Sequence, residues 1–235
     1  MDSDGLFLPI LVAIVVVIIT IVILFRRLLR SGKQYILLTG LNDSGKTLVY
    51  SQLLHNKHVT TFTSIQDNID NYTTEGKSIG IVDLPGFHSI RQQFFDKYKD
   101  NSKGILYIVD SVTLPKNIRD AAIVLYNILT DPVVIKNRPD ILIVCNKQDQ
   151  TLAKGSNVIK SMLEKELNTL RNTQLNQLEQ LDAKEHTNSK LGDISKDFSF
   201  ANLYCKVDFT ESYAFSKNGS VDLEGLKKWV GKLAN

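Results

Sequence analysis

The sequence predicts an α/β fold, a doubly wound and mostly parallel sheet with one apolar helix ahead of it. Short runs rich in Ile, Val and Leu alternate with segments of helical periodicity, a pattern typical of βαβ units. A glycine-rich loop follows the first of these runs, and an apolar segment of 20 residues precedes it. The 235 residues suffice for one sizeable domain and an appendage.

The apolar segment covers residues 6–25, carries no charge and is interrupted only by Pro9 and Thr20. At about 1.5 Å per residue its length matches the hydrocarbon core of a bilayer, so we expect a transmembrane helix. A cleaved signal peptide is the alternative. It needs a positively charged start and a small-residue cleavage site, whereas Asp2 and Asp4 precede this segment and no such site follows it.

Basic residues directly behind the segment set the expected orientation; they are Arg26, Arg27, Arg30 and Lys33. By the positive-inside rule, everything after Phe25 lies in the cytosol. The sequence therefore predicts a short lumenal or external N-terminus at 1–5, a span at 6–25, a basic linker at 26–34 and a cytosolic domain at 35–235.

The glycine-rich loop fits the pattern G-x-x-x-x-G-K-[ST], in which backbone N–H groups cradle phosphate oxygens. It consists of Gly40, Leu41, Asn42, Asp43, Ser44, Gly45, Lys46 and Thr47. Lys46 would reach the β- and γ-phosphates, and the Thr47 hydroxyl would bind Mg²⁺. An ordinary glycine-rich turn is the alternative. The flanks favour the phosphate loop, because the apolar run at 35–39 predicts a strand and a helical pattern follows Lys46.

The same alternation predicts the rest of the domain. Glu75 and Gly76 predict a turn between two short strands, the second at 78–82, whereas 55–71 shows no long periodicity. Polar residues predict a flexible surface insertion at 182–197. Further strands are expected at 104–109, 140–145 and 206–209, and helices at 92–98, 117–129, 158–181 and after Asp222, which would cap the last helix.

A second loop, Asp83-Leu84-Pro85-Gly86, follows the strand at 78–82 and has the pattern D-x-x-G. The carboxylate of Asp83 would hold Mg²⁺ through water, as the acidic residue of the second nucleotide-binding strand does in P-loop proteins. The backbone N–H of Gly86 would approach the γ-phosphate closely. Alone this pattern is weak, because Asp and Gly are common in turns.

A third loop, Asn146-Lys147-Gln148-Asp149, follows the strand at 140–145 and has the pattern N-K-x-D. Asp149 can accept hydrogen bonds from N1–H and the N2 amino group of guanine, a donor pair that adenine lacks. The alkyl stem of Lys147 can lie along the base. Because the carboxyl ends of parallel strands meet at one edge of a sheet, the three loops together predict a guanine-nucleotide site.

Composition excludes some other functions. The formal net charge is +3, and Lys and Arg are scattered along the chain, so we expect no direct binding to nucleic acid. The two cysteines, Cys145 and Cys205, lie in apolar runs without metal-ligand spacing. We expect both to be buried free thiols, which suits a reducing compartment.

With these motifs the chain resembles the beta-subunit family of the signal recognition particle receptor, membrane-anchored relatives of the Arf and Sar small GTPases. The resemblance also includes Thr61-Phe62-Thr63-Ser64-Ile65, which looks like the first switch of the family, and Leu163–Arg171. It implies a Ras-like P-loop GTPase fold, GTP or GDP and Mg²⁺ as cofactors, and Thr63 as a further residue contacting Mg²⁺. It also implies the endoplasmic reticulum membrane as location and the N-terminal region of the receptor's alpha subunit as partner, with the ribosome or the translocon as a further candidate.

Two positions depart from the family pattern. Phe87 follows the D-x-x-G glycine, where the family usually carries His and Ras-type proteins carry the Gln that orients the attacking water. His88, one position later, is the candidate catalytic residue, and we expect slow or partner-dependent GTP hydrolysis. The last guanine motif would be Ser212-Tyr213-Ala214-Phe215, with the N–H of Ala214 serving guanine O6.

Three functions remain open. The first is a GTP-binding receptor subunit whose output is a partner interaction, and the second is an enzyme that turns over GTP for work at a membrane. The third is an Arf-like membrane-traffic GTPase, which the built-in anchor disfavours because those proteins use a reversible helix or acyl chain. For the first, GTP would order both switches and assemble an apolar patch from Phe62, Ile65 and Phe87, to which the alpha subunit would bind. Packing of these side chains into the core is the alternative.

Overall fold

The computed structural model describes residues 13–22, 24, 35–59, 64, 66–180, 191–192, 196–215 and 218–234. The chain forms two compact units, Met1–Lys33 and Gln34–Asn235. In the first unit, residues 13–22 and 24 are helical. No helix within the described residues is long and apolar enough to cross a membrane, and part of the predicted span at 6–25 lies outside those residues.

Within the described residues, a six-stranded sheet forms the centre of the second unit, in the order β2-β3-β1-β4-β5-β6. The strands are β1 Tyr35–Gly40, β2 Asn68–Thr74, β3 Lys77–Asp83, β4 Ser102–Asp110, β5 Asp140–Asn146 and β6 Val207–Glu211. β2 runs antiparallel to β3, and the other neighbouring strands run parallel. This order confirms the prediction of a doubly wound, mostly parallel sheet.

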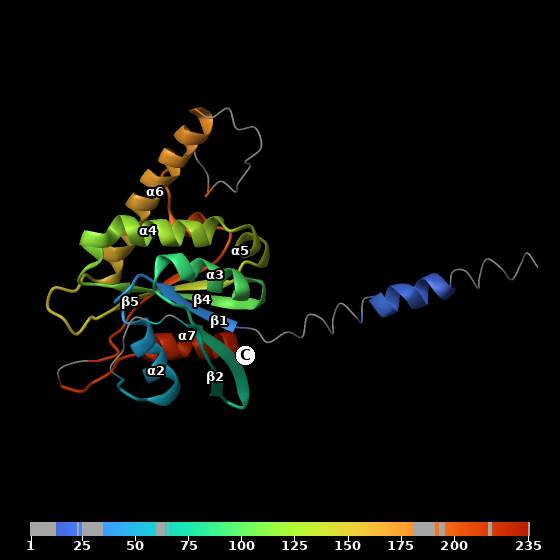
Figure 1. Ribbon diagram of the computed structural model, residues 1–235, viewed down its shortest axis with the longest axis horizontal. Coiled ribbons are helices and arrows are strands. Elements are labelled where there is room, and N and C mark those ends of the chain that lie inside the picture. The colour runs from blue at the N-terminus through green and yellow to red at the C-terminus, as the bar shows by residue number, and fades with distance from the viewer. Residues whose placement is uncertain are drawn as a thin grey trace, which may run out of the picture. The chain divides into compact units, whose positions relative to one another are not determined.

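The helices lie on both faces of this sheet (Figure 1). They are α2 Lys46–His55, α3 His88–Tyr98, α4 Leu114–Thr130, α5 Pro132–Asn137, α6 Ser156–Gln180 and α7 Glu224–Ala234, with short 3₁₀ turns η1 Lys99–Asn101 and η2 Phe200–Asn202. Helices α3, α4 and α6 cover one face, and α2 and α7 cover the other. The Asp222 carboxylate accepts a hydrogen bond from the N–H of Glu224, which confirms the predicted cap of the last helix.

The central strands are buried on both faces, which explains why their sequences are continuous apolar runs. Along β1, Leu37 faces α3 and α4, whereas Ile36 and Leu38 face α2 and α7, and all three are fully buried. Along β4, Tyr107 and Ile108 divide between the two faces in the same way. Each strand end is therefore held in place by two hydrophobic layers.

Several boundaries differ from the predicted ones. α3 begins at His88, earlier than the predicted start at 92, and α5 was not predicted at all. The sequence signal for α5 is Asp131 followed by Pro132, because proline suits the first position of a helix. In the structure the Asp131 carboxylate caps this helix by accepting hydrogen bonds from two backbone N–H groups of its first turn. β2 begins at Asn68, inside the segment without periodicity, because this edge strand is mostly exposed and carries polar residues.

The structure describes residues 191–192 and 196–197 of the predicted insertion at 182–197. Leu191 is 2% exposed and packs into the core beside α6. Arg171, itself 3% exposed, donates hydrogen bonds to the carbonyl oxygens of Leu191 at 3.5 Å and Lys196 at 2.7 Å. A buried guanidinium on α6 therefore fixes the returning chain, and the remaining residues around it, 181–190 and 193–195, lie outside the described residues.

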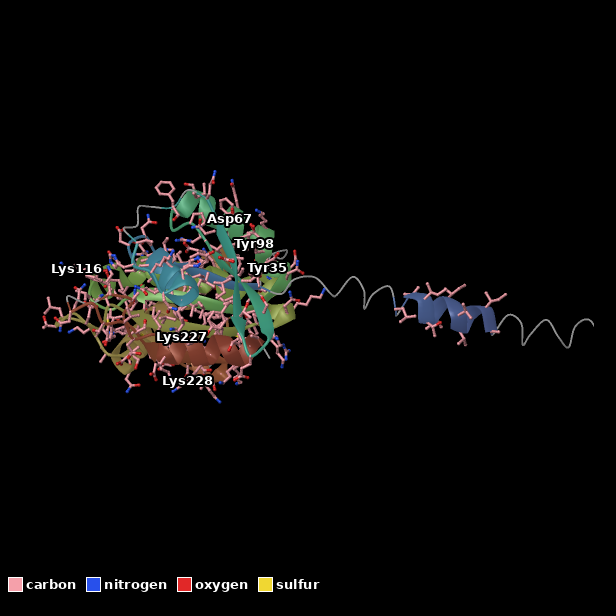
Figure 2. All side chains as sticks on the ribbon, turned by 90° about the horizontal axis from the view of Figure 1, so that it is seen from below. Tyr35, Asp67, Tyr98, Lys116, Lys227 and Lys228 are labelled. Atoms are coloured by element: carbon pink, nitrogen blue, oxygen red, sulfur yellow. The ribbon has the colours of Figure 1, made fainter. Side chains whose placement is uncertain are left out.

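A cluster of polar and aromatic side chains holds the segment at Asp67, just ahead of β2, against the end of α3. The Tyr98 hydroxyl donates a hydrogen bond to Asp67, and Lys97 Nζ lies 3.0 Å from the same carboxylate. The ring of Tyr98 also meets that of Tyr35 edge to face, with centroids 5.5 Å apart. Figure 2 shows Tyr35, Asp67 and Tyr98 close together. The cluster joins the start of β1, the end of α3 and the segment that leads into β2.

Candidate nucleotide-binding site

The three predicted loops lie at the carboxyl edge of the sheet. The first loop connects β1 to α2, the second follows β3 and the third follows β5. The register places Leu38 beside Asp83 and Leu106, and Asp110 beside Asn146, so the carboxyl ends of four neighbouring strands fall within about four residues of one another. The sheet thus brings together segments more than a hundred residues apart in the sequence.

The first loop is shaped to receive an anion. Helix α2 begins at Lys46, and neither a capping side chain nor an acidic residue occupies its first turn. Its first N–H groups are therefore available to phosphate oxygens, and the helix dipole favours negative charge there. Gly45 adopts φ 88°, a left-handed conformation, and a Cβ at this position would lie 2.5 Å from Asn146 Nδ2. Both constraints require glycine at this point of the loop.

Lys46 is buried beside the loop, with 6% of its surface exposed. Its Nζ donates a hydrogen bond to the Leu41 carbonyl at 2.6 Å. Burial lowers the pKa of Lys46 to about 8; the nearby carboxylate of Asp83 opposes this shift, and the guanidinium of Arg91 adds to it. Burial makes the charged form of Lys46 less stable than it is in water. An anion beside it, such as a phosphate, would stabilise that charged form.

Two of the three residues predicted to hold Mg²⁺, Thr47 and Asp83, meet at the base of the site. Thr47 Oγ1 donates a hydrogen bond to Asp83 Oδ2 at 2.8 Å, and Thr47 Oγ1 lies 3.4 Å from Ser64 Oγ. Asp83 is fully buried, its Oδ1 has no hydrogen-bond partner among the described residues, and burial raises its pKa. A buried carboxylate with a free oxygen beside a hydroxyl fits Mg²⁺, whose chemistry here would be to bind phosphate oxygens and offset their charge.

No cluster of three or more His, Cys, Asp or Glu that could hold a metal occurs in the described part of the chain. Magnesium sites of the phosphate-loop kind take one or two ligands from the protein and complete the coordination shell with phosphate oxygens and water.

The second loop lies directly against the first. A Cβ on Gly86 would lie 2.3 Å from Asn42 Oδ1 and 2.8 Å from Lys46 Nζ, so a side chain does not fit there. The Gly86 carbonyl accepts a hydrogen bond from Arg91 Nη1 at 3.0 Å. Gly86 is thereby held where its backbone could approach a terminal phosphate bound by Lys46.

The third loop is tied to the first by a side chain. Asn146, 2% exposed, donates a hydrogen bond from Nδ2 to the Ser44 carbonyl at 2.8 Å. Lys147 adopts φ 66°, and its Nζ lies 2.9 Å from Asp110 Oδ2. Asp149 is exposed at the rim of the site. This arrangement extends the stem of Lys147 across the loop and leaves the Asp149 carboxylate accessible to a base.

The predicted last motif reaches the same edge. The Ser212 N–H donates to the Cys145 carbonyl at 3.0 Å, and the Gln148 N–H donates to the Ser212 carbonyl at 3.1 Å. Ala214, two residues on, is 3% exposed. The segment that contains Ala214 therefore runs beside the third loop, where a contact with the guanine base requires it.

Asp110 and Arg91 are site residues that the sequence analysis missed. Asp110 ends β4 and receives Lys147 together with the N–H groups of Val112 and Thr113. Burial opposes its charged form, but these hydrogen bonds hold the pKa of Asp110 below its usual range. The signal was present, because Asp110 directly follows an apolar strand, as Asp83 does. Arg91 lies within a helical pattern and gave no such signal.

Three predicted residues of the switches are placed only in part. Thr63 lies outside the described residues, and so does the side chain of His88. Phe87 is 54% exposed, at the N-terminus of α3. Among the described residues, the structure brings Lys46, Thr47 and Asp83 close to the loop that Asn146 holds, and it leaves an exposed aromatic ring at the second switch.

The pKa of Lys46 predicts a pH dependence of nucleotide binding. A bound phosphate favours the ammonium form, so above about pH 8 binding must take up a proton, and affinity should fall by up to about tenfold per pH unit. Below pH 7 this contribution should vanish, because the free protein is already protonated. Nucleotide affinity measured from pH 6.5 to 9, with proton uptake by calorimetry in two buffers, checks this.

The exposed Lys116 supplies the matched control for this measurement. Lys116→Ala should keep the slope with pH, and Lys46→Ala should bind weakly with no slope. A wild-type affinity that stays constant up to pH 9 would contradict the role of Lys46.

Comparison with known proteins agrees with this geometry. The family model for the signal recognition particle receptor beta subunit matches residues 31–207. The human signal recognition particle receptor subunit beta is 39% identical over 242 residues, which cover 99% of this chain and 89% of the human protein. A solved structure of the mammalian SRP receptor is 38% identical with a TM-score of 0.75, covering 85% of this chain and all of that one.

The SRb-GTP/SRX complex from Chaetomium thermophilum is a more distant solved structure, 17% identical to this chain. It is similar in fold, with a TM-score of 0.61 over 86% of this chain and 99% of that one. The α/β fold with a mixed, mostly parallel sheet is that of the Ras-like GTPases. The family model spans most of the chain, and the human relative covers nearly all of it. The chain belongs to the family of signal recognition particle receptor beta subunits, small GTPases related to Arf and Sar.

Proposed function

We propose that this chain is the membrane-anchored GTP-binding subunit of a signal recognition particle receptor, which recruits the alpha subunit to the endoplasmic reticulum for co-translational protein targeting. The observation that carries the proposal is the meeting of three loops at one sheet edge, where each loop contributes one buried polar residue: Lys46, Asp83 and Asn146. GTP or GDP is the proposed ligand, with Mg²⁺ held by Thr47, Thr63 and, through water, Asp83.

An anchor at 6–25 is part of the proposal. The described helical residues of this segment support it, because their large apolar side chains are all exposed, with values of 47–58% from Ile14 to Leu24. A fully apolar helical surface is unfavourable in water and suits a lipid environment. The basic residues of the linker support the cytosolic side for the GTPase domain.

Slow or partner-dependent hydrolysis is proposed for the bound GTP. Phe87 occupies the position that orients the attacking water in Ras-type proteins, and a phenyl ring cannot hydrogen-bond a water molecule. The alternative function, an Arf- or Sar-like traffic GTPase with its own turnover, requires a competent residue at this point. The unassisted hydrolysis rate separates the two.

The alpha subunit is the proposed partner of the GTP form. Ser64 Oγ lies 3.4 Å from Thr47 Oγ1, so the first switch segment reaches the metal residues, and Phe87 stands exposed at the second switch. Phe62 and Ile65, the other proposed members of the apolar patch, lie outside the described residues. GTP would order both segments and so favour the form that exposes the patch to its partner.

Asp149→Asn should change the choice of base. The amide no longer accepts both guanine donors, so GTP should bind more weakly by ~1.5–3 kcal/mol for each lost or mispaired hydrogen bond to the charged group. Xanthosine triphosphate should bind better, because its 2-oxo group accepts from an amide. Competition binding of both nucleotides tests this, with Asp120→Asn on the exposed surface of α4 as control. GTP affinity equal to that of the wild type would exclude Asp149 as the base reader.

The alpha subunit's N-terminal region should bind the full chain more tightly in the presence of a GTP analogue than of GDP. A coupling of ~1–3 kcal/mol corresponds to about 5–150-fold, and the partner must tighten GTP by the same factor. Phe87→Ala should weaken the GTP-form complex, whereas Val158→Ala, which removes an equally exposed apolar side chain from α6, should not. Calorimetric titration of the alpha subunit's N-terminal region against the full chain in nanodiscs measures these affinities. Equal affinities for the GTP-analogue form and the GDP form would mean that the protein tethers its partner without a nucleotide switch.

Protease added to sealed microsomes should digest everything beyond the linker at 26–34. This follows from the basic residues that flank the apolar segment on one side. Microsomes opened with detergent serve as control for protease access. Protection of the bulk of the chain in sealed vesicles would reverse the proposed orientation.

A further inference from the structure

A cavity of about 340 Å³ lies between α3 and α4 on one face of the sheet, and it shares Arg91 with the nucleotide site. Its lining includes Arg91 and Phe95 from α3, Val124 and Ile128 from α4, and Thr39 from β1. Neither the phosphate loop at 40–47 nor the second and third loops contribute to it. Its volume falls in the range of small-molecule sites, about 300–1,000 Å³.

Arg91 brings a buried positive charge to this cavity. The residue is 8% exposed, and among the described residues no Asp or Glu forms an ion pair with it. Both of its hydrogen bonds come from Nη1, to the carbonyls of Gly40 at 3.4 Å and Gly86 at 3.0 Å. Nε and Nη2 have no hydrogen-bond partner in the described part of the chain, and neither is among its fully buried polar atoms, so both are open to a ligand or to solvent. A largely buried guanidinium without a counter-ion favours an anion within reach.

The other polar groups of the lining favour a single negative charge. Thr39 Oγ1 is buried, with the residue 1% exposed, and has no hydrogen-bond partner among the described residues. Asp131 also lines the cavity, but its carboxylate is already engaged by Lys99 Nζ at 2.7 Å and by two backbone N–H groups. The guanidinium therefore faces an anion site in which a second negative charge would be repelled by Asp131.

The lining also has an apolar part. Phe95, Val124 and Ile128 are between 3% and 7% exposed and form the inner wall. Gln92 and Asn127, both exposed, stand at the rim. A ligand that fits this distribution has one charged end for the guanidinium and an apolar body for the wall.

We propose that the α3–α4 cavity is a binding site for a small organic carboxylate with an apolar body. Its carboxylate would pair with Nε and Nη2 of Arg91 in the two-point geometry that guanidinium groups favour. The Thr39 hydroxyl would donate the next hydrogen bond. The same guanidinium holds the Gly40 and Gly86 carbonyls through Nη1, so this ligand would touch a side chain that also contacts two loops of the nucleotide site.

The competing explanation is that nucleotide phosphates alone compensate Arg91. The guanidinium lies near enough to Lys46 to disfavour its charged form, so a phosphate beside Lys46 would also attract Arg91. That explanation predicts no carboxylate binding at the cavity in the nucleotide-loaded protein. The experiment is therefore done on the full chain in nanodiscs, loaded with GDP.

Phenylacetate is the probe, and its neutral analogue phenylacetamide is the matched control ligand. Ligand-observed NMR titration, with empty nanodiscs subtracted, should give saturable phenylacetate binding at least tenfold tighter than that of phenylacetamide. Arg91→Met should weaken phenylacetate at least tenfold and leave phenylacetamide unchanged. Equal binding of the two probes, or no saturable binding of phenylacetate, would overturn the proposal.

A second variant localises the probe without touching the guanidinium. Asn127→Trp should fill the rim of the cavity and abolish phenylacetate binding, while GDP affinity and the unfolding midpoint stay as in the wild type. Asn157→Trp makes the same change at an exposed position of α6 outside the lining, and should bind phenylacetate normally. Phenylacetate binding that survives in Asn127→Trp, or phenyl phosphate binding more tightly than phenylacetate to the wild type, would refute the proposed site.

Discussion

The hydrogen bond from Asn146 to the Ser44 carbonyl joins two loops that are 102 residues apart in the sequence. It fixes the distance between the part of the site that would hold phosphates and the part that would hold the base. Gly45 must be glycine because the amide of Asn146 occupies the space of its Cβ. The side chain that looks like a base-reading residue in the N-K-x-D pattern therefore acts first as a support for the phosphate loop.

Near this bond the protein buries two charges of opposite sign, which offset each other only in part. Lys46 and Asp83 are both buried; burial lowers the pKa of the first and raises that of the second. Each shift reflects a charged form that is less stable in the protein than in water, and each is relieved by a ligand of opposite charge. An anion such as a phosphate would stabilise the charged form of Lys46, and a divalent cation would stabilise the charged form of Asp83. Because the two residues lie in one site and the two ligands attract each other, each ligand should favour the binding of the other.

The sequence predicted the central strands and the three loops because their signals are local. Buried parallel strands read as continuous apolar runs, and the loops between them must carry the glycines and carboxylates that the site uses. What escaped prediction depends on contacts between distant segments. Arg91 looks like any polar residue of a helix until the fold brings it under Gly40 and Gly86. β2 has no apolar alternation to reveal it, and Leu191 joins the core where Arg171 on α6 contacts its carbonyl oxygen.

The polar residues of β2 affect how neighbouring copies of this protein can pair with one another. β2 forms one edge of the sheet, where backbone groups are open to pairing with another chain. Its sequence, Asn68-Ile69-Asp70-Asn71-Tyr72-Thr73-Thr74, places Asp70 near the middle of that edge, and its first four residues are all exposed. A membrane confines its proteins to two dimensions and raises the frequency with which equivalent edges meet. If the anchor confines this chain in that way, the charge and amides of β2 would keep neighbouring copies from extending one another's sheets.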